Sequence, residues 1–409
     1  MPSEWRETSF GDLMDIPTRN GIHKGPPFQG HGVPVVKMGE VYHTDVVCDA
    51  QRDLLDLTPQ ELDRLEVVKD DLLFCRTSLV AAGVGHCAIV GELSRRTTFA
   101  SNLIRVRLDS ESTAPRYWFY HFRSPAGQEQ LLSIARGTSV TTITGPDIAA
   151  LRVAAPDVAR QRTIARILGA LDDKIELNRK MNETLAQMAR AIFKSWFVDF
   201  EPFRDKGMTD SPLGGIPKGW KAGTVADVAK FNAWTLRDTD DLDRIEYIEI
   251  SEVTRGDVVN VQVFSRGTEP SRARRRLRHG DTVLSTVRPE RKSYFLCLNP
   301  PTSLIASTGF AVFSPTAAPW SFVHAALTRP DVFEHLGTQA DGGAYPSVHA
   351  EVIAALPIPL PPAPILDGFQ RICAPLYQKA AYNRIESRTL AAIRDALLPK
   401  LMSGEVKIR

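Results

Sequence analysis

Two long stretches of the chain carry apolar or small residues at spacings that alternate between four and three. In the first, at 160–197, these positions are Ile164, Leu168, Leu171, Ile175, Asn178, Asn182, Leu185, Ala189, Ile192 and Trp196. In the second they are Phe369, Cys373, Leu376, Ala380, Asn383, Ser387, Leu390, Arg394, Leu397 and Leu401. This spacing is typical of a coiled-coil seam. We therefore predict two long helices that pack either on each other or on their own globular parts. We favour packing on each other, because each seam extends over roughly 50 Å.

Both stretches belong to an internal repeat that covers most of the chain. A shift of 205 residues superposes Asn178 on Asn383 and keeps register from residue 137 to residue 186. Upstream the offset grows to 210, where "DDLLF" faces "GDTVL", as expected when two copies differ in loop length. Each copy is then a globular part of roughly 150 residues followed by one helix. Antiparallel pairing predicts a pseudo-two-fold axis near the helix midpoints, with Asn178 facing Asn383 and the globular parts at opposite ends.

Short runs in both globular parts are rich in β-branched and aromatic residues, which is typical of strands. Examples are "VPVVKM", "HCAIV", "NLIRVRL", "RIEYIEI", "SYFLCL" and "GFAVF", with helical segments around "TPQELDRL" and "RYWFYHFRSPAGQEQLLSIA". The expected class is α+β: two similar mixed α/β domains and two long helices in an antiparallel coiled coil. The predicted boundaries are a first domain at 1–155, a central helical region at 156–200, a linker at 201–216, a second domain at 217–360 and a C-terminal helical region at 361–409.

Cysteine usage, the N-terminal residues and one uncharged stretch indicate where in the cell the protein is expected. The five cysteines are scattered and lack a C-x-x-C spacing, so we expect neither a disulfide framework nor a zinc site, and a cytoplasmic location. The N-terminus has no basic region followed by an apolar core, so no secretory signal is expected. Residues 293–328 lack charged side chains, but their prolines, serines and threonines favour buried strands over a membrane span.

The net charge of +2 conceals a local basic run. Nine bases and three acids lie between Arg266 and Lys292, whereas eight acids and three bases lie between Arg237 and Asp257. The centre of the basic run is "SRARRRLRH" at 271–279. Two basic modules on a rigid spacer suit duplex DNA, because arginine and lysine neutralise phosphates while groove contacts supply specificity. By itself the run is equally compatible with a solvated surface loop.

Four features together point to a family. They are the repeat, the run from Gly137 to Pro156, "RQRTIARILGALDDKIELNRKMNETLAQMARAIFKSWF" at 160–197, and the C-terminal "LLPKLMSGEV". A chain with these features resembles, over essentially its full length, the specificity (S) subunits of type I restriction-modification systems. The second copy departs from the pattern where "GTSVTTI" becomes "GGAYPSVH" and where Gln161 has no matching glutamine.

The resemblance implies a DNA-binding protein without catalysis, cofactor or metal of its own. Its two target-recognition domains would each read one half of a bipartite double-stranded DNA site. Its expected partners are two modification (methyltransferase) subunits and the restriction (translocase and nuclease) subunits. By charge and loop placement, the candidate DNA contacts are Arg76, Arg136, Arg274, Arg275, Arg276, Arg278 and Arg288. The DNA sequence that is read, and the division of these arginines between bases and phosphates, cannot be deduced from the sequence.

Three alternative functions can be weighed against the sequence. A standalone adenine-N6 methyltransferase is suggested by "FQGHG" at 28–32 and "NPPT" at 299–302, but these motifs lie in different copies, and Thr302 stands where an aromatic residue is needed. A non-catalytic coiled-coil adaptor would need neither a basic run nor two large modules. A nuclease would need clustered carboxylates, and the acidic run at 237–246 has no counterpart in the first copy.

Overall fold

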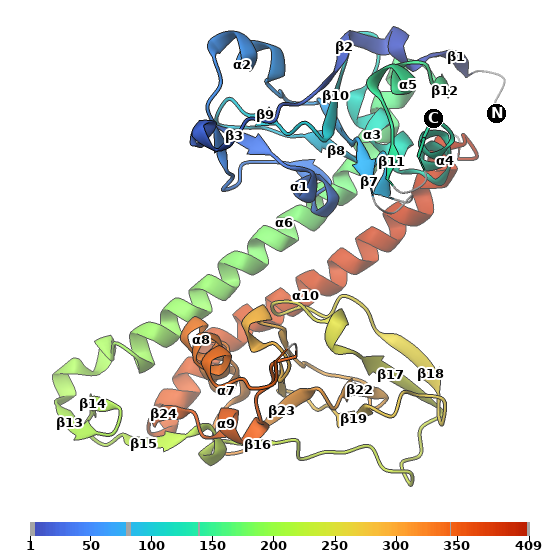
Figure 1. The fold of residues 1–409 in the computed structure, drawn as a ribbon. Coiled ribbons are helices and arrows are strands. Elements are labelled where there is room, and N and C mark those ends of the chain that lie inside the picture. Colours follow the sequence, from blue (N-terminus) through green and yellow to red (C-terminus); the bar gives the residue numbers. More distant parts are fainter. Residues whose placement is uncertain (1–4, 79–82, 138–139, 344, 407–409) are drawn as a thin grey trace. The chain divides into compact units, whose positions relative to one another are not determined.

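The computed structural model describes residues 5–78, 83–137, 140–343 and 345–406. The chain divides into two compact units: unit 1 is Met1–Ile175 with Arg388–Arg409, and unit 2 is Glu176–Ser387. Each unit holds one globular part together with a portion of each long helix (Figure 1). Both units combine sheets with helices, so the predicted α+β class is confirmed.

The centre of unit 1 is a five-stranded sheet that is antiparallel except between β4 and β8. In order its strands are β2 (Met14–Asn20), β10 (Leu103–Leu108), β6 (Leu72–Cys75), β8 (Cys87–Val90) and β4 (Val46–Val47). The smaller sheets are β5 (Leu54–Leu55) with β3 (Gln29–Val36) and β9 (Thr98–Phe99), β1 (Arg6–Ser9) with β12 (Arg152–Ala155), and β7 (Thr77–Ser78) with β11 (Thr141–Thr142). Strands β6 and β8 are buried along their whole length, which explains their continuous apolar runs.

The described residues of unit 1 also form five shorter α-helices. They are α1 (Met38–His43), α2 (Pro59–Leu65), α3 (Pro115–Arg123), α4 (Pro125–Ser133) and α5 (Gly145–Ala149). The helical segment predicted around 116–135 is two helices, because Pro125 holds Ser124 in extended backbone and α3 ends there. The Ser124 hydroxyl accepts a hydrogen bond from the Gly127 N–H at 3.2 Å and caps α4.

Unit 2 contains two four-stranded sheets. The first has the order β16 (Ala229–Phe231), β23 (Phe310–Pro315), β20 (Thr282–Ser285) and β21 (Tyr294–Leu296). The second has the order β18 (Gln262–Ser265), β17 (Arg244–Ile248), β22 (Leu304–Ser307) and β19 (Ala273–Arg276). Two-stranded pairs are β13 (Met208–Ser211) with β14 (Gly214–Pro217), and β15 (Lys221–Thr224) with β24 (Pro357–Leu360). The shorter helices are α7 (Trp320–Leu327), α8 (Pro330–Thr338) and α9 (Ala350–Ala354).

The two units share a four-strand core order and one strand pair, as the internal repeat predicts. Strand β1 pairs with β12 in the register Ser9 opposite Arg152, and β15 pairs with β24 in the equivalent register, Thr224 opposite Pro357. The order β2–β10–β6–β8 in unit 1 corresponds to β16–β23–β20–β21 in unit 2. The charge-free stretch at 293–328 supplies β21, β22, β23 and the fully buried α7, so it is core, as expected. In the described part of the chain, no helix has the length and apolar character that crossing a membrane requires.

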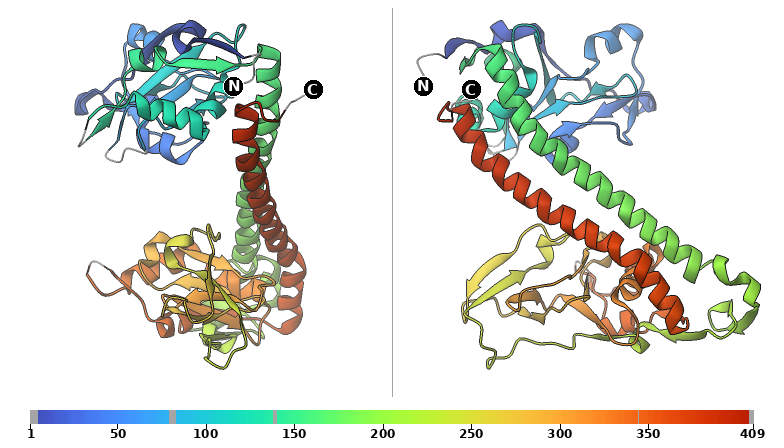
Figure 2. Two further views of the ribbon diagram at one scale, coloured as in Figure 1. Left: turned by 90° about the vertical axis from the view of Figure 1, so that its right-hand side faces the viewer. Right: turned by 180° about the vertical axis from the view of Figure 1, so that it is seen from behind.

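The long helices are α6 (Val158–Phe197) and α10 (Ala363–Met402). In unit 1 the first turns of α6 and the last turns of α10 enter the same apolar core, with Leu168 and Leu401 both buried. In unit 2 the last turns of α6 meet the first turns of α10, where the Trp196 and Phe369 rings lie 6.1 Å apart between centroids. The helices are therefore antiparallel within each unit, and they pack both on each other and on the globular part (Figure 2).

None of the twenty predicted seam positions is exposed. The large apolar side chains that are exposed on the two helices occupy other positions: Leu177, Met188, Ile372, Tyr382, Ile385 and Ile393. The 4–3 spacing therefore selects the covered face of both helices.

The two seam asparagines are buried next to each other, as predicted. The Asn178 amide nitrogen lies 3.4 Å from the Asn383 backbone carbonyl, to which it donates. It also donates to the Ser387 hydroxyl at 3.2 Å. The Asn383 amide nitrogen donates to the Asn182 side-chain oxygen at 2.9 Å. The shift of 205 residues exchanges the Asn178–Ser387 and Asn182–Asn383 contacts, as the repeat predicts for an antiparallel pair. Each asparagine thus bonds to a seam residue of the partner helix.

The missing glutamine of the second copy is matched by a second change. In unit 1 the buried Gln161 side-chain oxygen accepts from the Thr113 hydroxyl at 2.7 Å and from the Ala114 N–H at 3.0 Å. The positions in unit 2 that correspond to Thr113 and Gln161 are Ala318 and Leu366, which both lie in the apolar core. Because both partners change together, no buried polar group is left without its partner at this site.

The segment at 201–216, predicted as a linker, is folded. It contains the 3₁₀ helix η4 (Glu201–Lys206) and most of the β13–β14 hairpin. Phe203 and Ile216 are buried in the same core as Trp220. The domain boundaries themselves stay a prediction.

Candidate nucleic-acid interface

Both units contain the same small hairpin, which we call the tip loop: residues 136–137 with 140–142 in unit 1, and 341–343 with 345–347 in unit 2. In unit 1 the backbones of Arg136 and Thr142 exchange two hydrogen bonds, of 2.9 and 2.8 Å. In unit 2, Asp341 and Ser347 exchange the equivalent pair, of 3.0 and 2.8 Å. Thr138, Ser139 and Ala344, which belong to the two motifs compared above, lie outside the described residues.

A glycine begins the turn in both tip loops. Gly137 has φ +104° and Gly342 has φ +117°, a region that side chains with a Cβ rarely adopt. A Cβ on Gly137 would also lie 2.3 Å from the Val140 carbonyl oxygen. The change from "GTSVTTI" to "GGAYPSVH" therefore keeps the first glycine and the closing pair of hydrogen bonds, while the exposed side chain changes from Val140 to Tyr345.

Each tip loop lies against the segment that leaves a buried central strand. In unit 1 the Ile143 N–H donates to the Arg76 carbonyl, one residue after β6, at 3.0 Å. In unit 2 the Val348 N–H donates to the Thr286 carbonyl, just after β20, at 2.9 Å. The same two elements therefore meet in both units.

Three of the predicted arginines lie on these elements. In unit 1, Arg76 is half-buried at the end of β6, and Arg136 is exposed in the tip loop, where its guanidinium lies 2.9 Å from Asp147. In unit 2, Arg288 follows β20, and its backbone N–H donates to the Pro346 carbonyl of the tip loop at 2.8 Å. These residues are far apart along the chain, and the fold brings them to the tip loops.

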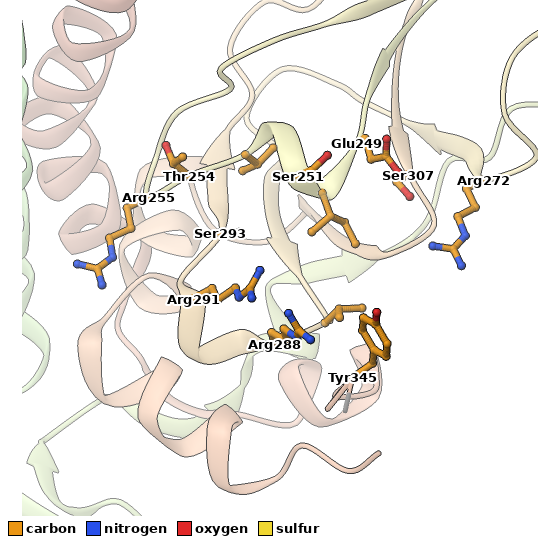
Figure 3. A pocket seen from close by; sticks show the side chains of 13 residues that line it. Glu249, Ser251, Thr254, Arg255, Arg272, Arg288, Arg291, Ser293, Ser307 and Tyr345 are labelled. Carbon is orange, nitrogen blue, oxygen red and sulfur yellow. The ribbon is translucent and has the colours of Figure 1, made fainter. Parts of the chain in front are cut away.

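In unit 2 the tip loop borders an arginine-lined hollow of about 960 Å³. Most of its lining residues lie in or next to the 3₁₀ helices η6 (Ile250–Glu252) and η7 (Pro289–Arg291). The hollow is lined by Arg255, Arg272, Arg288 and Arg291, and Glu249 is the one carboxylate among the described lining residues. Figure 3 shows Arg288 and Arg291 side by side, with Arg272 at another edge and Tyr345 next to Arg288.

Two of these arginines are available for an anionic ligand. Arg272 and Arg291 are exposed, and no carboxylate of the described residues forms an ion pair with either guanidinium. Arg288 has left-handed backbone (φ +49°), and its guanidinium lies 4.8 Å from the centre of the Tyr345 ring. A cation over an aromatic face is attracted to it, so this contact holds Arg288 and Tyr345 together at the rim of the hollow.

The basic run at 271–279 is not a solvated loop, because Ala273–Arg276 form the edge strand β19. Arg274, Arg275 and Arg276 are half-buried, and Arg278 is exposed with its guanidinium 3.3 Å from the centre of the Trp234 ring. Arg276 pairs with Asp240 at 2.8 Å. Burial lowers the pKa of Arg275 below its ordinary value. None of these four arginines is among the described residues that line the hollow.

The acidic run at 237–246 supplies counter-charges to the basic run. Asp240 pairs with Arg276, and Asp238 lies 3.8 Å from Arg266. Among the described residues, no cluster of three or more His, Cys, Asp or Glu side chains is arranged to hold a metal ion. Asp240 therefore has a structural role, because it pairs with Arg276.

Sequence reasoning missed Arg255, Arg272, Arg291 and Tyr345. Arg272 and Arg291 belong to the basic stretch counted from Arg266 to Lys292, but nothing in their spacing separates them from Arg274–Arg276. The tip loop offered a signal, because Tyr345 is an aromatic residue between glycines and a proline.

Comparison with known proteins identifies the class of this repeated α+β chain. The model of the type I restriction modification DNA specificity domain matches residues 2–187. The specificity subunit of type I restriction enzyme MjaIX of Methanocaldococcus jannaschii is 22% identical over 99% of this chain and 97% of its own length. The specificity subunit of type I restriction enzyme HindI of Haemophilus influenzae is 25% identical over 99% of this chain and 100% of its own length.

A solved structure shares the fold. The crystal structure of the type I restriction-modification system S subunit from M. genitalium matches with a TM-score of 0.55 at 15% identity, covering 97% of this chain and 96% of that one. Residues 2–187 thus match the DNA specificity domain of type I restriction-modification systems, and the two relatives that span the whole chain are specificity subunits of such systems. The resemblance expected from the sequence is confirmed.

Proposed function

We propose that the chain recognises a bipartite double-stranded DNA site, with the globular part of each unit binding one half. The observation that carries this proposal is the repeated tip loop, which meets an arginine-bearing segment in both units. In unit 2 this arrangement borders a hollow whose exposed arginines, Arg272 and Arg291, suit phosphate oxygens. In unit 1 the equivalent elements carry Arg76 and Arg136.

The chain acts without catalysis in this proposal, as part of a larger cytoplasmic assembly. Two modification subunits and the restriction subunits supply the chemistry, and the chain selects the DNA. "FQGHG" supports this non-catalytic role, because it follows the 3₁₀ helix η2 (Pro26–Phe28) and enters β3, so it lacks the preceding strand of a nucleotide-binding turn. "NPPT" lies between β21 and β22, in the other unit.

The charge of the hollow can be tested by the salt dependence of DNA binding. We expect Arg272→Ala with Arg291→Ala to weaken binding to all duplex sequences, because phosphate contacts carry no sequence information. The slope of log K against log salt concentration should fall by roughly 0.9 for each phosphate that the variant no longer neutralises. Fluorescence anisotropy of labelled duplexes over a series of salt concentrations would measure both effects.

A matched control removes an arginine that does not line the hollow. Arg244 is exposed on β17 and pairs with Glu246 at 2.9 Å, so Arg244→Ala removes one positive charge elsewhere in unit 2, half of the charge change in the double variant. We expect a smaller change of slope for this variant. An equal slope for the wild type and the double variant would contradict DNA binding in the hollow.

A further inference from the structure

Tyr345 is an aromatic residue that the fold exposes. Its side chain is 71% exposed at the turn of the tip loop in unit 2. The turn is closed by the Tyr345 N–H, which donates to the Gly342 carbonyl at 3.0 Å, and Pro346 follows directly. The backbone at Tyr345 is therefore held, while most of its ring is open to solvent.

The ring is also oriented by a neighbour. The Arg288 guanidinium lies 4.8 Å from the ring centre, and the Arg288 backbone is itself bonded to Pro346. Tyr345 and Arg288 both line the hollow, beside Arg291 (Figure 3). An exposed ring that is held at the edge of a cationic surface suits a ligand that is anionic and also offers flat or apolar groups.

The same position in unit 1 carries an apolar residue of a different shape. The shift of 205 residues brings Val140 onto Tyr345, and Val140 is 45% exposed in the equivalent tip loop. The same loop carries the exposed Arg136. The two tip loops, which share the same closing hydrogen bonds, thus present different exposed side chains, Val140 and Tyr345.

We propose that Tyr345 and Val140 are specificity-determining residues that contact bases, each in its own half of the DNA site. This inference rests on the proposed DNA-recognition function. Phosphates are read by charge and by hydrogen-bond donors, which the arginines provide. In a duplex the base edges in the grooves offer hydrogen-bond groups, which the Tyr345 hydroxyl can meet, and thymine methyl groups, which an aromatic or aliphatic side chain can contact. One backbone scaffold with different tip side chains gives the two half-sites different sequences.

The test uses the full-length chain assembled with its modification subunits. Tyr345→Ala should lower affinity for the cognate duplex roughly 5- to 150-fold, the range that one good base contact provides, and leave affinity for an unrelated duplex unchanged. The methylated motif, read by sequencing modified DNA, should lose discrimination in one half-site only. Val140→Ala should relax the other half-site only.

Two further variants separate a base contact from other roles. Tyr345→Phe distinguishes the ring from the hydroxyl group: affinity is kept where the ring contacts a thymine methyl group and is lost where the hydroxyl bonds to a base edge. Tyr382 is a matched control, because it is an exposed tyrosine under a cation, with Lys379 4.9 Å from its ring centre on α10. Tyr382→Ala should leave the methylated motif unchanged.

Several outcomes would overturn the inference. These are an unchanged motif for Tyr345→Ala, an equal loss of affinity for all duplexes, or a loss of assembly with the modification subunits, which would make the tip loop a protein contact. If Tyr345→Ala does not fold, as judged by its thermal unfolding, Tyr345→Ser and Tyr345→Phe give the same comparison. One outcome separates the two proposals: the salt slope falls in the Arg272→Ala, Arg291→Ala variant while Tyr345→Ala leaves the methylated motif unchanged. In that case the inference fails and the proposed function stands.

Discussion

A buried aspartate at the start of a central strand has different partners in the two units. In unit 1, Asp71 accepts from Arg107 at 2.7 and 2.8 Å. In unit 2 the equivalent Asp281 is fully buried and accepts from the Arg278 N–H at 2.7 Å, while Ser314 stands in the place of Arg107. Burial raises the pKa of the Asp281 carboxyl from 3.8 to about 6. The first copy therefore holds a counter-charge at a position where the second copy has a neutral serine.

This difference predicts opposite effects of one substitution at two equivalent sites. Because the pKa of Asp281 is higher in the folded state, its contribution to stability is present below pH 3.8 and disappears as the pH rises through about 6. Asp281→Asn should therefore raise the free energy of unfolding near neutral pH by up to about 3 kcal/mol and flatten its dependence on pH. Urea unfolding on both sides of the raised pKa would measure this effect.

The control is Asp71→Asn in unit 1. It leaves the Arg107 guanidinium without its carboxylate and should lower the free energy of unfolding by about 3 kcal/mol. Stabilisation by both substitutions, or by neither, would show that the two buried carboxylates are not distinguished by their partners.

At the scale of elements, the long helices owe their register to a few polar seam residues. Asn178 and Asn383 are fully buried, and each is bonded to a polar seam residue of the partner helix. In unit 1 the seam residue Arg394 pairs with Asp172 at 2.7 Å. Leucine would fill the same space but would not distinguish one register from the next.

We therefore expect Asn178→Leu with Asn383→Leu to keep or raise the melting temperature while loosening the register. Amide hydrogen exchange along α6 and α10 would report the loosening as lower protection around residues 171–192 and 376–397. As a control, Leu185→Ala, at an apolar seam position, should lower the melting temperature without a register change. Unchanged protection in the double variant would show that apolar packing alone sets the register.

At the scale of the whole molecule, a bipartite DNA site has two half-sites separated by base pairs that are not recognised, which we call the spacer. We expect the length of the paired helices to set the length of this spacer, and we call this role the ruler. Each helix has 40 residues, or about 60 Å. One added heptad would lengthen the pair by about 10 Å, which is only about a third of a DNA turn. Three heptads add about 32 Å, close to the roughly 34–36 Å of a full turn, and so preserve the face of the duplex.

The prediction is that three heptads inserted into both helices lengthen the spacer by about nine to ten base pairs and keep both half-sites. Sequencing of DNA methylated by the assembled complex would show the new spacing. Insertion into one helix alone is the control, because it misaligns the seam and should abolish specific methylation. Disappearance of one half-site with an unchanged spacer would exclude the ruler.

Local pattern along the chain was sufficient to establish the repeat, the two helices, their covered faces, the main strands and the family resemblance. Such features are readable because spacing along one element decides which side chains are buried. The features that join distant residues came only from the folded chain. It holds Arg288 against Tyr345, places Arg274–Arg276 in a strand beside an acidic run, and bonds Asn178 to Ser387. These contacts depend on strand order and register, which bring together residues that no local sequence pattern links.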